Sequence, residues 1–146
     1  MNKLQIRQLS ESAILPTRAH EHDAGLDIYA SESVMIYKDM TRKVPTGIAV
    51  DIPPGYEATI RPRSGKTANT ALRVNIGTID SRFQGELQIT CDCYGSDIFY
   101  RVEKGEKIAQ LVISPIVTPS LEIVDQFDTQ SERGTNGFGS TDEVIP

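Results

Sequence analysis

Short stretches in which apolar and polar residues alternate, separated by turns, constrain the fold of this chain more than any other feature. Every second residue is apolar in Leu87–Cys93, and Tyr56–Arg61 keeps the same two-residue period. Successive side chains of a β-strand point to opposite faces of the sheet, so this period is typical of a strand with one buried face. Turn-forming stretches such as "IPPGY" and "EKGEK" separate the strands. The pattern predicts about ten short strands.

The chain shows no long stretch with the helical period of about 3.6 residues. One short helix is predicted over residues 64–72, and the other strands are predicted over 4–9, 26–30, 34–37, 46–52, 72–75, 97–102, 108–116 and 121–127. Many short strands without long helices favour an all-β fold, a jelly-roll-like sandwich or barrel, over a fold in which strands and helices alternate. The 146 residues suit a single domain.

The last part of the chain differs in composition from the rest. Residues 131–146 are polar, rich in glycine and without periodicity, whereas residues 1–130 carry the predicted strands. Taken alone, a segment with so few apolar residues is predicted to be a flexible tail. We therefore divide the chain into a β domain over 1–130 and a C-terminal segment over 131–146.

Charge and composition exclude several functions. The formal net charge of −5 argues against binding of long nucleic acids, which favour spread positive charge. No apolar run is long enough to span a membrane, and the N-terminal stretch lacks the apolar core of a signal peptide, so a soluble cytoplasmic protein is predicted. Cys91 and Cys93 share one strand face and are predicted to be buried, reduced thiols. The polar stretch His20–Asp23 has too few further ligands to favour a dedicated metal site.

One basic cluster stands out against this acidic background. The stretch "IRPRSGK" places Arg61, Arg63 and Lys66 around Ser64 and Gly65. Arginine offers a rigid fork of donors to a phosphate, and a serine beside a glycine lets backbone N–H groups approach the same anion. The stretch therefore fits a site for a small anion, although a solvated basic strand end is the simpler interpretation of these residues alone.

Four further stretches carry polar residues that the predicted strands do not require. Asp27 lies in "DAGLDIYA", Asp80 and Phe83 lie in "NIGTIDSRFQGEL", a predicted strand, tight turn and strand, and Gln110 lies in "GEKIAQLV". The fourth stretch, "RGTNGFGST", combines an arginine with glycines, an aromatic ring and hydroxyls. Singly, each has a structural explanation: the aspartates could hold turns, and Gln110 could lie at a sheet edge. Together they supply what a nucleoside triphosphate needs, namely phosphate donors, carboxylates for Mg²⁺ and water, and rings for base and sugar.

In this order and spacing, the five stretches resemble the five sequence motifs of the trimeric dUTPases, from "LPTRAHEHDAGLDIYA" to "RGTNGFGST". The resemblance implies a threefold homotrimer with active sites shared between subunits. It also implies hydrolysis of dUTP to dUMP and pyrophosphate with Mg²⁺ as cofactor, which would keep uracil out of DNA and supply dUMP for thymidylate synthesis. The C-terminal segment would close over the substrate as a lid.

The resemblance implies a role for each motif residue. Asp80 would position the water that attacks the α-phosphorus, and Asp27 would help to hold Mg²⁺ through water. The expected substrate-binding residues are Arg63, Ser64, Gly65, Asn75, Gly77, Thr78, Ile79, Phe83, Gln88, Gln110, Arg133, Phe138, Gly139, Ser140 and Thr141. Among them, the basic cluster and Gln110 would bind phosphates, a hairpin over 74–79 would bind uracil, and Phe138 would lie over the base.

Several positions depart from the family's usual pattern. Phe83 stands in place of a tyrosine that packs under the deoxyribose; the ring is kept, so discrimination against ribose is expected to hold. Lys66 stands where an apolar residue is usual, and Asp142 where a glycine often follows the fifth motif. The uracil hairpin is also shorter than its commonest form, which leaves open whether Asn75 contacts the base or shapes the turn.

Two alternative functions fit part of the pattern. A dCTP deaminase has a similar fold, but it lacks the glycine-rich tail with its phenylalanine and does not normally carry Pro-Arg-Ser-Gly. A nucleotide-controlled binding protein, in which dUTP orders the tail for an unknown protein partner, would suit a segment that folds on binding. Asp80 speaks against a purely binding role, because a carboxylate beside phosphates weakens binding unless it handles water or metal.

Overall fold

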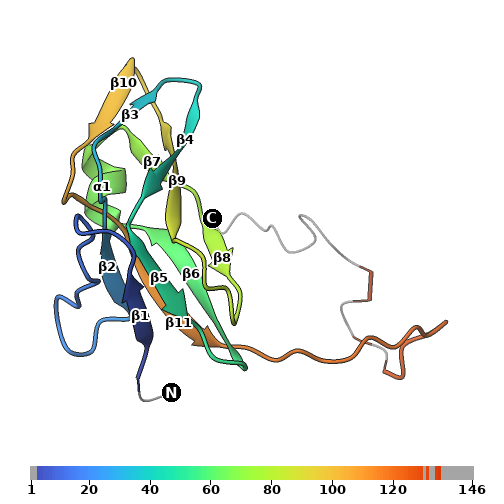
Figure 1. Cartoon of the computed structure of the whole chain (residues 1–146). Helices are drawn as coiled ribbons and strands as arrows, with labels where there is room; N and C mark the ends of the chain where they lie inside the picture. Colours follow the sequence, from blue (N-terminus) through green and yellow to red (C-terminus); the bar gives the residue numbers. More distant parts are fainter. Residues whose placement is uncertain (1–2, 130, 132–133, 136–146) are drawn as a thin grey trace.

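The computed structural model of the protein describes residues 3–129, 131, 134 and 135. Within these residues the chain forms eleven strands and one short helix, and no helix there is long and apolar enough to cross a membrane. The elements, shown in Figure 1, are β1 (Gln5–Gln8), β2 (Gly25–Tyr29), β3 (Val34–Tyr37), β4 (Thr41–Pro45), β5 (Ile48–Asp51), β6 (Tyr56–Pro62), α1 (Ser64–Asn69), β7 (Leu72–Val74), β8 (Gly77–Ile79), β9 (Gln88–Cys93), β10 (Phe99–Val102) and β11 (Lys107–Pro115). The roles expected for Arg133, Phe138, Gly139, Ser140 and Thr141 concern residues outside the described part.

The strands pair in antiparallel ladders that form two larger sheets and two ribbons. One larger sheet has the order β2-β11-β6-β8 and the other the order β4-β9-β7, while β1 pairs with β5 and β10 pairs with β3. Most strands that are neighbours in space are distant in the sequence, as in jelly rolls and unlike a simple up-and-down meander. The predicted all-β, jelly-roll-like fold is confirmed.

One apolar core joins the two larger sheets. Ile28 of β2 and Leu111 of β11 belong to the same buried cluster as Val44 of β4 and Ile89 of β9, and all four side chains are fully buried. Three of these four strands were predicted from their apolar pattern, which places one face of each sheet inside the molecule. Burial of an aliphatic side chain of this size contributes about 1.5–3 kcal/mol.

The sequence pattern does not reveal β4. Of its five residues only Val44 is buried, and the preceding Thr41, Arg42 and Lys43 are exposed. The strand lies at the edge of its sheet, where charged side chains are common because they protect an unpaired strand edge. A strand with one apolar side chain carries too little alternation to be recognised.

The strand predicted over residues 121–127 is wrong. No strand forms there, and the side chains that give the segment its alternating pattern lie in solvent: Leu121 is 97% exposed and Ile123 is 99% exposed. Figure 1 shows the chain leaving the domain after β11 and running away from it. An apolar alternation produces a strand only where a neighbouring strand pairs with it and a core covers it. The described residues of this chain supply neither.

Cys91 and Cys93 both lie in β9 and are buried and free of disulfides, as predicted. Burial, reinforced by the negative charges of Asp92 and Glu106, raises the pKa of Cys91 to about 12. The thiolate is the reactive form of cysteine, so this thiol is unreactive at neutral pH.

Candidate active site

A pocket of about 550 Å³ lies between β2, the start of α1 and β11. Five residues expected to bind phosphate or metal line it, namely Asp27, Arg63, Ser64, Gly65 and Gln110. In the sequence they belong to three separate motifs. The fold brings these motifs together because β11 pairs with β2 on one side and with β6, which leads into α1, on the other.

Gln110 faces this pocket because of its place in β11. The flanking Ala109 and Leu111 are buried in the core, so the alternation of the strand turns Gln110 outward. β11 lies between β2 and β6, which excludes the interpretation of Gln110 as an edge residue. The Nε2 group of Gln110 donates a hydrogen bond to the carbonyl of Pro62 at 2.9 Å, and this bond holds the amide beside the basic cluster.

Two glycines border the pocket for different reasons. A Cβ atom built on Gly25 would lie 2.3 Å from the Oε1 atom of Gln110, so a larger residue in β2 would displace this amide. A Cβ atom on Gly65 would meet no atom within 4 Å. Packing within the chain therefore does not require glycine at position 65, whereas close approach of an anion to the backbone N–H groups would.

Asp27 contacts two cations at the pocket. Its Oδ1 atom lies 2.9 Å from Nε of Arg63, and its Oδ2 atom lies 2.9 Å from Nζ of Lys107. The Asp27 side chain is only 13% exposed, so these contacts are screened less than surface ion pairs are. Nη1 of Arg63 also donates to the Lys107 carbonyl at 3.3 Å. These contacts orient the guanidinium of Arg63 and leave further N–H donors for an anion.

Sequence reasoning does not identify Lys107 as a site residue. The hydrogen bond from its amine to Asp27 is the main cause that raises the pKa of Lys107, which is therefore positively charged at neutral pH. The only sequence signal is a basic residue close to Gln110 in "GEKIAQLV". Its contact with Asp27 depends on the pairing of β11 with β2, whose register shifts between Lys107 and Ala109.

Lys66, at a position that is usually apolar in the family, contacts the turn before β11. Its Nζ donates to Oε1 of Glu106, which also accepts a hydrogen bond from the Tyr100 hydroxyl at 2.7 Å. Partial burial would lower the pKa of Lys66, but the bonds to Glu106 and Tyr100 outweigh it and raise that pKa. Burial would likewise raise the pKa of Glu106, but hydrogen bonds from Lys66, the Glu103 amide and Tyr100 lower it. Lys66 thus connects α1, through its hydrogen bond to Glu106, with the turn before β11.

Replacement of Glu106 by glutamine should lower the free energy of unfolding at neutral pH by about 1–3 kcal/mol, because Lys66 would keep a partly buried charge without its partner. The pKa of Glu106 is lower in the folded state, so its contribution is present above the ordinary value of 4.5 and is lost as the pH falls below it. Urea unfolding of both proteins at neutral pH and at about pH 3 should therefore show a difference that shrinks in acid.

The matched control for this measurement is Glu103→Gln. Glu103 pairs with Arg101 at 3.0 Å, but both side chains are more than half exposed, so the loss of this pair should cost little. Equal losses of stability in the two variants, or a Glu106→Gln effect that persists unchanged in acid, would show that the Lys66–Glu106 pair does not stabilise α1.

The third motif does not form the expected hairpin. β7 pairs with β9 whereas β8 pairs with β6, so residues 74–79 cross from one larger sheet to the other. The physical reason is that the backbone of β7 continues its bonding to β9: the N–H of Asn75 donates to the carbonyl of Thr90 at 2.9 Å. Ile76, between the two strands, is 73% exposed. Of the residues expected to bind substrate, Gly77, Thr78 and Ile79 form β8, and Gln88 begins β9.

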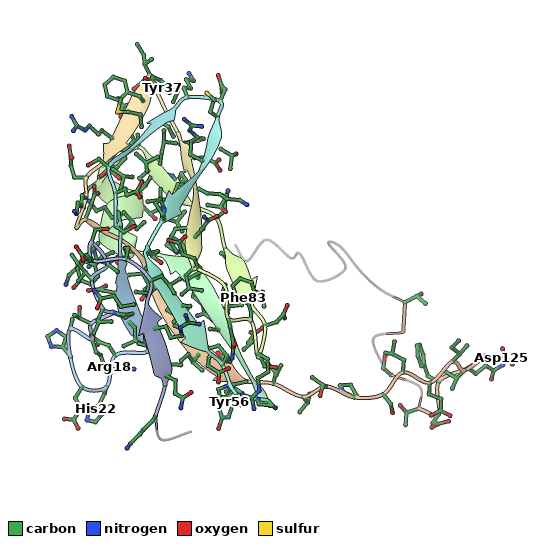
Figure 2. All side chains as sticks on the ribbon, in the orientation of Figure 1. Arg18, His22, Tyr37, Tyr56, Phe83 and Asp125 are labelled. Carbon is green, nitrogen blue, oxygen red and sulfur yellow. The ribbon has the colours of Figure 1, made fainter. Side chains whose placement is uncertain are left out.

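Asp80 and Phe83 form the turn that follows β8. The N–H of Phe83 donates to the carbonyl of Asp80 at 3.2 Å, and both side chains are exposed. A Cβ atom on Gly85 would lie 2.6 Å from Cζ of Phe83, so glycine there makes room for the ring. Neither Asp80 nor Phe83 lines the pocket between β2, α1 and β11 of its own chain. Figure 2 places Phe83 beside β8, on the opposite side of the view from β2 and α1.

Asp27 is the pocket residue that best fits a role toward Mg²⁺. Among the described residues, no group of three or more histidine, cysteine, aspartate and glutamate side chains is arranged to hold a metal. Mg²⁺ commonly keeps several waters and binds to one or two carboxylates together with substrate phosphates. Both oxygens of Asp27 already contact cations. A contact through water therefore suits this carboxylate better than direct coordination.

The sequence was compared with known protein families, and it matches one of them over most of its length. The sequence profile described as dUTPase matches residues 11–142. This chain belongs to the dUTPase family. It is 42% identical over 143 residues to the deoxyuridine 5'-triphosphate nucleotidohydrolase of Clostridium acetobutylicum, an alignment that covers 97% of each chain. It is 44% identical over 142 residues to the enzyme of the same name from Clostridium novyi, which covers 95% of this chain and 98% of the relative.

Solved structures of dUTPases share the fold. The dUTPase of Staphylococcus bacteriophage 80alpha with dUpNHpp is 36% identical and superimposes with a TM-score of 0.91, covering 98% of this chain and 100% of the phage chain. A variant of the dUTPase from phage phi11 of S. aureus, described with a structural Mg(II) ion, is 35% identical with a TM-score of 0.82 and covers 88% of this chain and 100% of its own. These relatives support the dUTPase prediction and do not favour the deaminase alternative.

Proposed function

We propose that this chain hydrolyses dUTP to dUMP and pyrophosphate. The observation that carries the proposal is the pocket lined by Asp27, Arg63 and Gln110, which we call the phosphate pocket. Its Asp27 carboxylate contacts Arg63 and also Lys107, which lies next to the pocket. Local cations in an otherwise acidic chain suit a short, highly charged anion such as a triphosphate. Membership of the dUTPase family supports dUTP as that triphosphate.

In the proposed reaction the phosphate chain lies along the start of α1. Arg63, Ser64 and Gly65 bind its oxygens, and Gln110 donates to the α-phosphate. Asp80 positions a water molecule and takes its proton as the water attacks the α-phosphorus. The bond from the α-phosphorus to the oxygen that bridges to the β-phosphorus breaks, and pyrophosphate leaves with that oxygen. Donors that bind most tightly as charge develops on the phosphates lower the barrier.

Mg²⁺ belongs to the proposal as a cofactor that neutralises phosphate charge when it is bound. Asp27 would hold it through water. Arg63 and Lys107 orient this carboxylate by contacting both of its oxygens, which supports an indirect role for Asp27 over direct coordination.

The base and sugar are recognised by the third and fifth motifs in this proposal. Residues 74–79 bind uracil through backbone groups, which match the O4 and N3 edge of uracil and not the opposite pattern of cytosine. Phe83 packs under the deoxyribose and excludes a 2′-hydroxyl. Arg133 meets the γ-phosphate, Phe138 lies over the base, and residues 139–141 complete the lid.

The proposed assembly is a homotrimer with shared active sites. Two observations support it: Asp80 does not line the phosphate pocket of its own chain, and the segment after β11 leaves the domain with its apolar side chains uncovered. Val117, Leu121, Ile123 and Phe127 in this segment are each at least 87% exposed, although burial of such side chains is favourable. A neighbouring subunit would cover them and would bring Asp80 of one chain to the pocket of another.

The cellular role in this proposal follows from the substrate and the product. Removal of dUTP keeps uracil out of DNA, and dUMP supplies thymidylate synthesis. A cytoplasmic location is part of the proposal, because the free thiols of Cys91 and Cys93 suit a reducing compartment.

Release of pyrophosphate from dUTP, with UTP, dCTP and dTTP as controls, tests the proposal. We expect turnover that strongly prefers dUTP, requires Mg²⁺ and stops when EDTA removes it. Release of ammonia from dCTP would assign the chain to deamination instead. Absence of turnover with every nucleotide would exclude the proposed activity.

A further inference from the structure

The turn that carries Asp80 and Phe83 is anchored to the end of β5. The N–H of Arg82 donates to the carbonyl of Ile52 at 2.9 Å, and Nη1 of Arg82 lies 3.2 Å from Oδ2 of Asp51. Arg82 thus contacts Ile52, the residue after β5, through its backbone, and Asp51, the last residue of β5, through its side chain. Among the described residues of the turn, Arg82 is the one whose side chain forms an ion pair with β5.

Arg82 adopts a backbone conformation that arginine rarely takes. Its φ angle is +64°, in the left-handed region that glycine, asparagine and aspartate populate more readily. A residue keeps such a conformation when surrounding contacts stabilise it. The two contacts to Ile52 and Asp51 are the ones that hold Arg82 here.

Asp51 depends on Arg82 in turn. Its Oδ1 atom is buried and has no hydrogen-bond partner among the described residues, and its side chain is only 23% exposed. A partly buried carboxylate needs a nearby cation, and Arg82 is the partner that the described part of the chain supplies. Loss of the guanidinium would therefore free the turn and also leave the Asp51 charge without compensation.

We infer that Arg82, held by Asp51, is a positioning residue that sets the orientation of Asp80 and Phe83. The inference rests on the proposed roles of those two residues. The Asp80 carboxylate has no partner among the described residues, so its direction depends on the backbone of the turn. Arg82 lies between Asp80 and Phe83, and it fixes this backbone from outside the phosphate pocket.

The test compares Arg82→Ala, Asp51→Asn and the double variant in the full chain. Misplacement of a reacting group typically lowers kcat by about tenfold to a hundredfold while binding of the ground state persists. We therefore expect each single variant to lose kcat in that range, with unchanged affinity for dUpNHpp and a weaker preference for dUTP over UTP. The double variant should be no slower than the slower single variant, because both remove the same contact.

Two further variants complete the test. Arg101→Ala breaks an exposed pair with Glu103 and should leave kcat unchanged. Arg82→Gly accepts a positive φ angle without strain and serves where Arg82→Ala fails to fold. Unchanged kcat in the variants, equal loss of dUpNHpp affinity, or additive effects in the double variant would overturn the inference. Absence of dUTP turnover by the unmodified chain would overturn the proposed function instead.

Discussion

Replacement of Asp80 by asparagine should abolish most of the turnover of dUTP while affinity for the nucleotide is kept or increased. The side chain is exposed and outside the core, so the fold should not change. Removal of a negative charge near the phosphates favours binding of the ground state, whereas positioning and deprotonation of water matter in the transition state. A general base typically contributes about 10²–10⁴ in rate, and kcat should fall in this range.

The measurement is pyrophosphate release at saturating dUTP, together with the dissociation constant of dUpNHpp. Asp97→Asn, which changes an exposed carboxylate between β9 and β10, is the matched control and should leave both quantities unchanged. A near-normal rate for Asp80→Asn would show that Asp80 only shapes its turn, and another group would then have to handle the water.

A strand could be predicted where its apolar and polar residues alternate and where the same chain supplies the core that buries its apolar side chains. β9 and β11 are examples: the apolar positions of both were evident in the sequence, and Ile89 and Leu111 are fully buried. Residues 121–127 are also rich in apolar side chains, but the structure gives them no strand and no core. A periodic pattern shows that a segment has an apolar face, and it does not show which molecule covers that face.

The candidate site divides in a similar way. Arg63, Ser64 and Gln110 were expected because each belongs to a motif whose residue types suit phosphate, and the fold places them around one pocket. Lys107 was missed because its contact with Asp27 follows from the pairing of β2 with β11. The register between two strands decides which lysine lies beside a particular carboxylate, and a single sequence does not reveal that register.

The residues of the Asp80 motif do not by themselves predict which subunit's pocket Asp80 serves; only the family resemblance implies a shared site. Its motif predicts a turn, which the structure contains, but the motif does not tell which pocket the turn serves. Because β8 lies at one edge of its sheet and β2 at the other, the turn and the proposed phosphate pocket are separated within one chain. Either the reaction does not use Asp80, or a second chain brings it to the pocket.

Mixed trimers distinguish these possibilities and give the second large predicted effect. Asp80→Ala and a chain that ends before Arg133 should each be inactive alone, since one lacks the proposed base and the other the proposed lid. If pocket, turn and lid come from three different chains, refolding the two together in equal amounts creates complete sites. A complete site needs its turn from a truncated chain and its lid from an Asp80→Ala chain.

Random cyclic assembly meets each of these two conditions half of the time, so about a quarter of all sites should recover activity. The rate per site should therefore reach about a quarter of that of the unmodified protein refolded in parallel. The control mixes the two variants after separate refolding, when trimers no longer exchange subunits, and should show no recovery. If turn and lid of a site came from one chain, no mixture could recover, because every chain lacks one of them. Zero activity in trimers verified to contain both variants would therefore exclude a site in which Asp80 and the lid belong to different subunits.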